Sequence, residues 1–191
     1  MLEWYRINAD YMDMLDETKA LIQHAAAIQE RNFDEWETIT ISDAFRQYAG
    51  WDPVLDYDED RFDVDLVEKV EPEIKRLGGP VVLMDYPAEA AALSRCKPGH
   101  PELAERWELY LDGIELANAY SELIDPAEQR RRFEDCAKKR RDLGKEVYSI
   151  DEAFIDALGR MPPSGGVALG IDRLLMVLSG EISLDPFLPF R

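Results

Sequence analysis

The stretch Trp107–Glu122 decides the fold, and it has the sequence Trp-Glu-Leu-Tyr-Leu-Asp-Gly-Ile-Glu-Leu-Ala-Asn-Ala-Tyr-Ser-Glu. Two runs of alternating apolar and polar residues, 107–111 and 114–117, flank Asp112-Gly113. This dipeptide tolerates the positive φ angles of a type I′ turn, and such a turn between alternating runs is the strongest local signal of a β-hairpin. The sequence therefore predicts two antiparallel strands joined by a two-residue loop.

The two-residue loop fixes which residues face each other across the hairpin. We expect Tyr110 to pair with Glu115 and Glu108 with Ala117. Glu108 and Glu115 then share one face as diagonal neighbours, with Cβ atoms about 7–8 Å apart. Carboxylates at that separation can hold Mg²⁺ between themselves and a polyphosphate. The alternative is a merely solvated face, since 40 of the 191 residues are Asp or Glu.

A second stretch, Ser164–Arg173, begins as a glycine-rich loop, becomes a short apolar strand and leads into a helix. One face of this strand carries only small residues: Gly166, Ala168 and Gly170. A flat ligand such as a purine can lie against a backbone of this kind. Arg173 follows at the start of the helix, where its planar guanidinium suits a phosphate or stacks on a base.

Three segments together resemble the class II aminoacyl-tRNA synthetases, in the branch that activates lysine. Gly-Val-Ala-Leu-Gly-Ile-Asp-Arg-Leu (166–174) is similar to motif 3, and residues 108–123 are similar to the hairpin before it. Met-Leu-Glu-Trp-Tyr-Arg (1–6) resembles the strand that closes motif 2 in the elongation factor P–(R)-β-lysine ligases. Ala117 and Ala168 stand where lysyl-tRNA synthetases have glycine, which favours the ligases.

The resemblance runs through the whole chain and implies both a fold and a reaction. The implied fold is an α+β domain on an antiparallel sheet flanked by helices, with residues 1–191 as the C-terminal part of a catalytic domain. The implied reaction uses ATP and Mg²⁺: a carboxylate oxygen attacks the α-phosphate and gives an aminoacyl-adenylate and pyrophosphate. In the ligases, lysine or β-lysine is then transferred to a lysine of elongation factor P.

The resemblance also implies roles for individual residues. Glu108 and Glu115 match the carboxylates that bind Mg²⁺ and ATP. The other ATP contacts are the backbone of Leu109, Gly170 and the catalytic arginine of motif 3, Arg173. The positions around a lysine-like substrate are Glu3, Tyr5, Glu115, Ala117, Asn118, Glu122 and Ala168. An ammonium group in a partly buried pocket needs carboxylates nearby, which gives Glu3 and Glu122 a physical role.

Asn118 has the wrong parity to share a strand face with Glu115, because side chains alternate between the two faces. If both residues serve one site, the strand must bulge or end after Ala117.

One departure from the family concerns the segment that should come first. Motif 1, with its dimer-forming helix, and the first strand of motif 2 have no counterpart in these 191 residues, and neither does the motif 2 arginine that grips the α-phosphate. We expect a fragment, a product of an internal start, or a naturally short paralogue that lacks the dimer interface of the family. Two alternatives stay open: a lysine–tRNA ligase catalytic domain, and a silent module that binds lysine or nucleotide.

Composition limits the partners. A formal charge of −18 opposes broad nucleic-acid binding, so tRNA is not an expected partner. Apolar runs are shorter than the ~20 residues of a membrane span, so no membrane partner is expected. Cys96 and Cys136 match no metal-binding spacing and indicate free thiols in a reducing cytoplasm.

The remaining pattern predicts strands over 2–7, 38–41 and 80–86, and helices over 11–28, 64–77, 126–143 and 150–158, with Asp10 and Asp125 as N-caps. Ser42 is expected to cap a helix that closes at Gly50, the acidic segment 51–65 to form a solvated loop, and the helix over 64–77 to be interrupted near Pro72.

The helix over 126–143 carries seven of the 22 basic residues: Arg130, Arg131, Arg132, Lys138, Lys139, Arg140 and Arg141. We favour a solvated face. The alternative is a docking surface for an acidic protein or an RNA backbone.

Overall fold

The computed structural model describes residues 1–187. Its strands are β1 (Leu2–Ile7), β2 (Glu37–Thr40), β3 (Pro80–Pro87), β4 (Cys96–Lys97), β5 (His100–Leu111), β6 (Ile114–Ser121) and β7 (Ser164–Leu169). Its α-helices are α1 (Tyr11–Ile28), α2 (Ile41–Tyr48), α3 (Glu59–Asp65), α4 (Glu71–Leu77), α5 (Pro126–Asp142), α6 (Glu152–Leu158) and α7 (Ile171–Leu178). A π-helical turn, η1 (Leu66–Val70), and two 3₁₀ turns, η2 (Ala88–Ala90) and η3 (Asp185–Phe187), complete the described elements.

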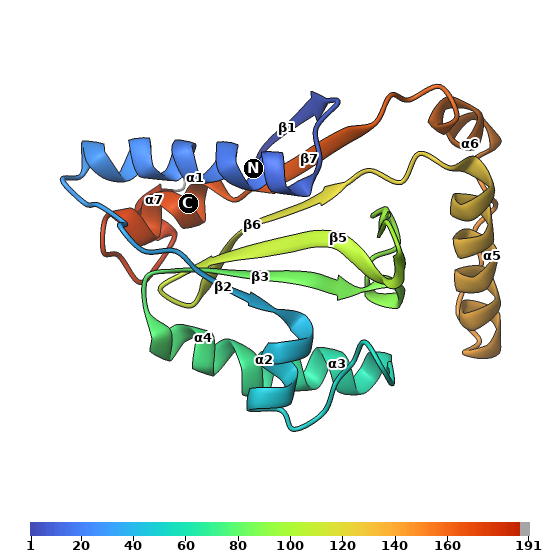
Figure 1. Ribbon diagram of the computed structural model, residues 1–191, viewed down its shortest axis with the longest axis horizontal. Coiled ribbons are helices and arrows are strands. Elements are labelled where there is room, and N and C mark those ends of the chain that lie inside the picture. The colour runs from blue at the N-terminus through green and yellow to red at the C-terminus, as the bar shows by residue number, and fades with distance from the viewer. Residues whose placement is uncertain (188–191) are drawn as a thin grey trace.

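The strands form one sheet in the order β1-β7-β6-β5-β3-β2, with β4 paired to β5 (Figure 1). The pair β2–β3 is parallel, and the other described pairs are antiparallel. Helices lie on both sides of the sheet (Figure 1). The predicted α+β domain, built on an antiparallel sheet flanked by helices, is confirmed.

One face of the sheet is covered by α1 and α7. Side chains from these helices, such as Met14 and Leu174, pack on Trp107, Leu109 and Val167 of the strands in one apolar cluster. Side chains alternate along each strand, so the neighbouring positions point to the opposite face.

The opposite face is covered only over part of the sheet. There α2, α3 and α4 place Phe45, Phe62 and Ile74 on β3 and β5, next to Leu83 and Tyr110. On β6, β7 and β1, the residues that point to this face line a cavity instead. Incomplete helical cover thus leaves an open region over β6, β7 and β1.

Local chemistry explains most helix ends. The Asp10 side chain accepts hydrogen bonds from the backbone N–H groups of Met12 and Asp13, and Asp13 reciprocates in a capping box, as expected for the start of α1. Asp125 caps α5, which begins with Pro126.

Two helix starts differ from the prediction. Thr40, not Ser42, caps α2, because its hydroxyl accepts from the Asp43 N–H. The acidic segment is a loop only in its first part, since Asp58 caps α3 at Glu59.

The helical region 59–77 is interrupted, as Pro72 predicts. The π-helical turn η1 separates α3 from α4, and Pro72 lies in the first turn of α4, where a missing N–H costs little.

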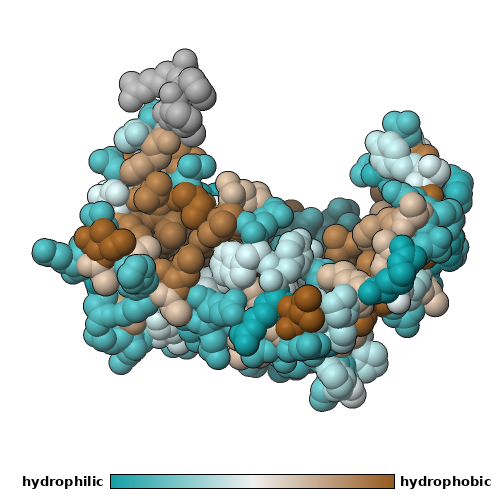
Figure 2. All heavy atoms as spheres, turned by 90° about the horizontal axis from the view of Figure 1, so that it is seen from above, coloured by the Kyte–Doolittle hydropathy of each residue, from teal (hydrophilic) through white to brown (hydrophobic). Residues whose placement is uncertain are grey.

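The helices α5 and α6 lie beyond the end of the sheet (Figure 1). Seen from above, the molecule is hollowed between this end and the opposite end (Figure 2). Among the described residues, no helix has the length and apolarity needed to cross a bilayer.

Candidate active site

The hairpin turn has the predicted conformation. Asp112 and Gly113 have φ angles of 52° and 79°, and Tyr110 pairs with Glu115. Beyond that pair the register shifts by one residue.

The shift is a β-bulge in which Leu116 is the extra residue on β6. Glu108 consequently pairs with Asn118, and the predicted pair of Glu108 with Ala117 is wrong. The expected bulge exists, but it comes before Ala117 rather than after it. The additional residue restores parity, so that Asn118 and Glu115 share one face.

Glu108 is the centre of a buried polar cluster. Arg106 donates from Nη2 to Glu108 Oε1 at 2.6 Å and from Nε to Asn118 Oδ1 at 3.1 Å. Tyr110 Oη donates to Glu108 Oε2 at 2.9 Å. Each oxygen of Glu108, which is 8% exposed, therefore has a donor and keeps a lone pair for another partner.

Glu108 also lies near two further carboxylates, Glu71 and Glu115. Burial raises the pKa of Glu115, and the charge of Glu108 raises it further. Burial likewise raises the pKa of Glu71, with added contributions from Glu108 and Glu115. Repulsion of this kind is relieved by a bound cation.

The pair Glu108 and Glu115 fits Mg²⁺ in the form that accompanies a polyphosphate. Mg²⁺ keeps several waters and is held by one or two carboxylates together with phosphate oxygens. No group of three or more His, Cys, Asp or Glu side chains in residues 1–187 forms a complete metal site. Two carboxylates match the protein ligands that Mg²⁺ uses when phosphate oxygens and waters complete its coordination.

Arg173 lies beside this carboxylate pair, in the first turn of α7. Its Nη1 donates to the Glu115 carbonyl oxygen at 2.8 Å and lies 3.4 Å from Glu115 Oε2. Gly170 precedes the helix and donates from its N–H to the Leu116 carbonyl at 2.8 Å. Half of the Arg173 side chain is exposed, so the guanidinium is accessible to a phosphate.

A cavity of about 200 Å³ lies next to these groups on the open face. Strand pairing builds it in rows: Glu3, Ala168 and Asn118 form one row across β1, β7 and β6, and Tyr5, Gly166 and Tyr120 form the next. Glu122 also lines the cavity. Of the predicted substrate positions, the structure brings together Glu3, Tyr5, Asn118, Glu122 and Ala168.

Glu122 has the most perturbed carboxyl group in this cavity. Burial alone raises its pKa to about 7. Among residues 1–187 it makes no ion pair, and the charges of Glu122 and Glu3 add to the effect of burial in raising the pKa of Tyr5. A half-buried carboxylate without a counter-ion is a binding position for a cation.

Gly166 is required by close packing over β7. A Cβ atom there would lie 2.7 Å from both Glu122 Oε1 and the Tyr5 ring. Since Tyr5 covers Gly166, the flat face predicted for a purine is restricted to Ala168 and Gly170.

Two predicted positions lie on the other face of the sheet. Ala117 is 1% exposed and packs beneath α1 and α7, so its expected place in the substrate pocket is wrong. Leu109 also points into that core, which leaves only its backbone for a ligand.

Sequence reasoning missed two residues of the site, Tyr120 and Arg106. Tyr120 lies between Asn118 and Glu122, at the spacing of two residues that places strand side chains on one face. This spacing could have indicated Tyr120 from the sequence. Arg106 stands two positions before Glu108, so the same period of two places it on the site face.

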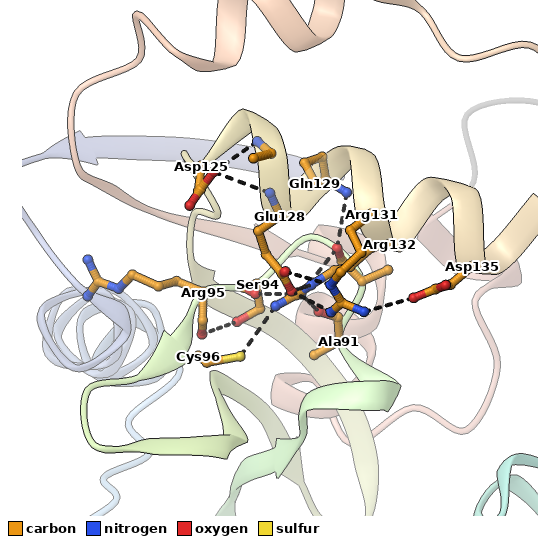
Figure 3. A network of polar contacts seen from close by, with 12 residues as sticks. Ala91, Ser94, Arg95, Cys96, Asp125, Glu128, Gln129, Arg131, Arg132 and Asp135 are labelled. Atoms are coloured by element: carbon orange, nitrogen blue, oxygen red, sulfur yellow. Dashed lines mark hydrogen bonds and ion pairs between the residues drawn. The ribbon is translucent and has the colours of Figure 1, made fainter.

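The loop before β4 connects the pocket to the basic helix α5. Ser94 forms an isolated antiparallel bridge with Glu122, and Leu123 N–H donates to the Leu93 carbonyl at 3.1 Å. Arg132 of α5 donates from Nη1 to the carbonyls of Ala91 and Ser94, each at 2.9 Å (Figure 3).

Several basic side chains of α5 are therefore engaged within the molecule. Arg132 also bonds Glu128, Arg131 pairs with Glu128 and Asp135, Arg130 with Glu152, and Lys139 with Glu59. The basic face of α5, which we expected to be solvated, therefore makes several ion pairs within the protein.

The fold indicates the class of protein. A mostly antiparallel open sheet flanked by helices is consistent with a class II synthetase domain. A family model supports this assignment: residues 1–190 match tRNA synthetases class II (D, K and N), and the chain belongs to this family.

Curated relatives narrow the family further. The chain is 34% identical over 221 residues to the lysine–tRNA ligase 2 of Methanosarcina mazei. It is 34% identical over 212 residues to the elongation factor P–(R)-β-lysine ligase of Vibrio atlanticus, and 35% over 208 residues to that of Vibrio cholerae. All of this chain is covered in each comparison, which spans 43% of the first relative and 64% of the other two. These identities do not separate the two kinds of relative.

Proposed function

We propose that this domain activates the carboxyl group of lysine or β-lysine with ATP, as an adenylate, for transfer to a lysine of elongation factor P. The observation that carries the proposal is Glu122, a half-buried carboxylate without a counter-ion, in a pocket that adjoins Glu108, Glu115 and Arg173.

The amino-acid end of the site recognises charge. An ammonium group entering the pocket meets Glu122 and Glu3 and removes the cost of holding a partly desolvated carboxylate ionised. The aromatic rings of Tyr5 and Tyr120 supply apolar walls for the carbon chain. A lysine-like ligand, with a long aliphatic stem and a terminal ammonium, matches both features.

The nucleotide end of the site neutralises negative charge. Glu108 and Glu115 would hold the Mg²⁺ of Mg·ATP, which would offset charge on the phosphates when bound. Arg173 would contact a phosphate directly, and Arg106 fixes the position of Glu108. Such groups act by alignment and electrostatic stabilisation.

The choice between α-lysine and β-lysine as substrate rests on Ala168. The choice between tRNA and elongation factor P as acyl acceptor rests on the net charge. Ala168 lies in the row between Glu3 and Asn118, where its methyl group narrows the space for an α-amino group. The formal charge of −18 opposes a tRNA backbone. Transfer to tRNA is the second candidate, because lysine–tRNA ligases are among the relatives at the same identity.

The proposal includes two further expectations. The isolated 191-residue chain is impaired in adenylate formation, because none of its arginines matches the motif 2 arginine that would act together with Arg173. In the extreme case the chain is a catalytically silent paralogue that binds lysine. The reaction takes place in the cytoplasm, in keeping with two free cysteines, Cys96 and Cys136.

Calorimetric titration with lysine tests the proposal directly. We expect binding by the unmodified chain, at least tenfold weaker binding by Glu122→Gln, and no change in Glu181→Gln, which alters an exposed carboxylate outside the pocket. Norleucine, which lacks the side-chain ammonium, should bind to none of the three chains. Equal lysine affinities in the two variants would contradict the assignment of the pocket.

A further inference from the structure

A second cavity, of about 350 Å³, lies on the same face of the sheet as the amino-acid pocket, on the β3 side of Arg106. Its lining residues come from α3 and the segment before it, from β3, and from the segment that follows β3. The contacts of Arg106 with Glu108 and Asn118 separate it from the amino-acid pocket. Its volume lies within the range of small-molecule sites, about 300–1,000 Å³.

Three aromatic side chains form the walls of this cavity. The rings of Tyr57 and Phe62 are 5.7 Å apart between centroids, and those of Phe62 and Tyr86 are 6.3 Å apart. The Arg106 guanidinium already lies 4.4 Å from the centre of the Tyr86 ring. Aromatic faces attract cations, so these walls favour a positively charged ligand with apolar stretches.

Carboxylates complete the lining. Burial raises the pKa of Tyr57 to about 12, and the charges of Glu59, Asp63 and Glu89 contribute to that rise. Glu59 pairs with Lys139 of α5, with Nζ and Oε2 3.3 Å apart. Over residues 1–187, Asp63 and Glu89 have no such pair. Two uncompensated carboxylates thus remain at the cavity.

A buried hydroxyl at the same cavity is also without a partner. Tyr86 is 1% exposed, and its Oη lies beside Glu108 without forming a hydrogen bond to any described residue. Buried hydroxyls are nearly always hydrogen-bonded, so this one indicates a site whose ligand or water is not part of the chain.

We propose that this cavity is a second binding site, for a primary ammonium group on an alkyl chain. The aromatic walls suit the methylene groups, and Asp63 and Glu89 suit the charged end. The same carboxylates repel anionic groups that carry no metal ion, so nucleic acid and free carboxylates do not fit the cavity. The site does not depend on the proposed function, since its residues other than Arg106 and Glu108 belong to neither the ATP end nor the amino-acid pocket.

Two kinds of ligand carry a primary ammonium group on an alkyl chain: a free diamine, and a lysine side chain within a polypeptide. Cadaverine represents the first and N-acetyl-lysine methylamide the second. The neutral analogue 1,5-pentanediol has the same carbon chain as cadaverine and should not bind.

The test is calorimetric titration of the Glu122→Gln chain without ATP, so that ammonium binding in the amino-acid pocket is disabled. We expect cadaverine or the lysine amide to bind with a 1:1 stoichiometry. Adding Asp63→Asn and Glu89→Gln should weaken binding at least tenfold, whereas adding Asp60→Asn, on the same helix but not lining the cavity, should not. Thermal unfolding followed by circular dichroism identifies any variant that fails to fold, and in that case Tyr57→Leu replaces it.

The comparison of the two probes identifies the source. Tighter binding of cadaverine supports a free diamine, and equal or tighter binding of the lysine amide supports a polypeptide lysine. Absence of binding by both probes, or equal losses in the Asp63/Glu89 and Asp60 variants, would overturn the proposal. Lysine binding at Glu122 is measured in a separate titration. If lysine does not bind there, the test of the second cavity is unaffected.

Discussion

Glu108 and Asn118 face each other across β5 and β6, and Arg106 bonds both of them. This pairing exists because Leu116 is an extra residue on β6. One bulge therefore brings the proposed nucleotide end and the proposed amino-acid end of the site onto a single face.

Replacing Arg106 by Gln should destabilise the fold strongly. The change leaves the buried Glu108 carboxylate without its ion-pair partner, and such losses typically cost about 3–5 kcal/mol. Urea unfolding measures the effect, with Arg76→Gln as control because Arg76 makes an exposed i, i+3 pair with Glu73. Similar midpoints for the two variants would show that Glu108 is not held by this contact.

Replacing Glu115 by Gln should weaken Mg·ATP binding about tenfold or more, because one of two carboxylates facing the metal is lost. The matched control is Glu181→Gln, whose carboxylate is exposed. Titration with ATP in the presence and absence of Mg²⁺ separates metal from nucleotide contacts. If the variant loses no more affinity with Mg²⁺ than without it, Glu115 does not act through the metal.

Stability should depend on pH through Glu122. Its carboxyl pKa rises from an ordinary 4.5 to about 7 in the folded chain, so folding favours the protonated form. The resulting stability is fully present below about pH 4.5 and is lost as the pH rises through 7. Glu122→Gln should accordingly stabilise the protein by about 1–2 kcal/mol at pH 8, after allowance for partial exposure, and change little at pH 4.5. Urea unfolding at the two pH values measures the difference, and equal effects at both would refute the assigned titration.

Lysine binding should show the opposite pH dependence. The ammonium group needs the ionised form of Glu122, so affinity should fall as the pH drops from 8 to 6, by up to about tenfold for a pKa near 7. In Glu122→Gln the affinity should be low and flat over this range. A pH dependence that persists in the variant would assign it to another group.

Arg132 should support the position of Glu122 through the 91–94 segment. In Arg132→Gln the carbonyls of Ala91 and Ser94 lose their donor, so lysine affinity should fall while ATP affinity is kept. Arg131→Gln is the neighbouring control, because Arg131 is 61% exposed and pairs with Glu128 and Asp135 of its own helix. Equal losses of lysine and ATP affinity in Arg132→Gln would indicate general unfolding rather than positioning.

Replacing Ala168 by Gly should shift selectivity toward α-lysine. The lost methyl lies between Glu3 and Asn118, and a change of one methyl group typically alters selectivity by about 1–3 kcal/mol. The ratio of the dissociation constants for α-lysine and β-lysine measures the shift. An unchanged ratio would remove the main physical support for β-lysine, and Ala117 offers no substitute because it points to the other face.

The sequence predicts local features of this protein well, because their causes are local. Asp112-Gly113 requires a turn with positive φ, and Asp10 begins a helix through its own hydrogen bonds. The small residues of β7 alternate as expected, so Ala168 reaches the pocket.

What could not be predicted depends on partners distant in the sequence. The bulge at Leu116 occurs where β6 has to match β5 on one side and β7 on the other. It reverses the parity that put Ala117, rather than Asn118, on the face of Glu115. The second cavity arises from α3 packing against β3 and β5, which no local pattern encodes.

The pairing of β1 with β7 has a consequence for the order of events during synthesis. Tyr5 and Gly166 are neighbours in the pocket although about 160 residues separate them along the chain. A nascent chain on the ribosome has therefore made β1 and β6, two of the three pocket strands, before β7 emerges. Until β7 is released and inserts between β1 and β6, a growing chain has no amino-acid pocket. The pocket proposed for lysine therefore forms only at the last stage of synthesis, when β1, β6 and β7 are all present.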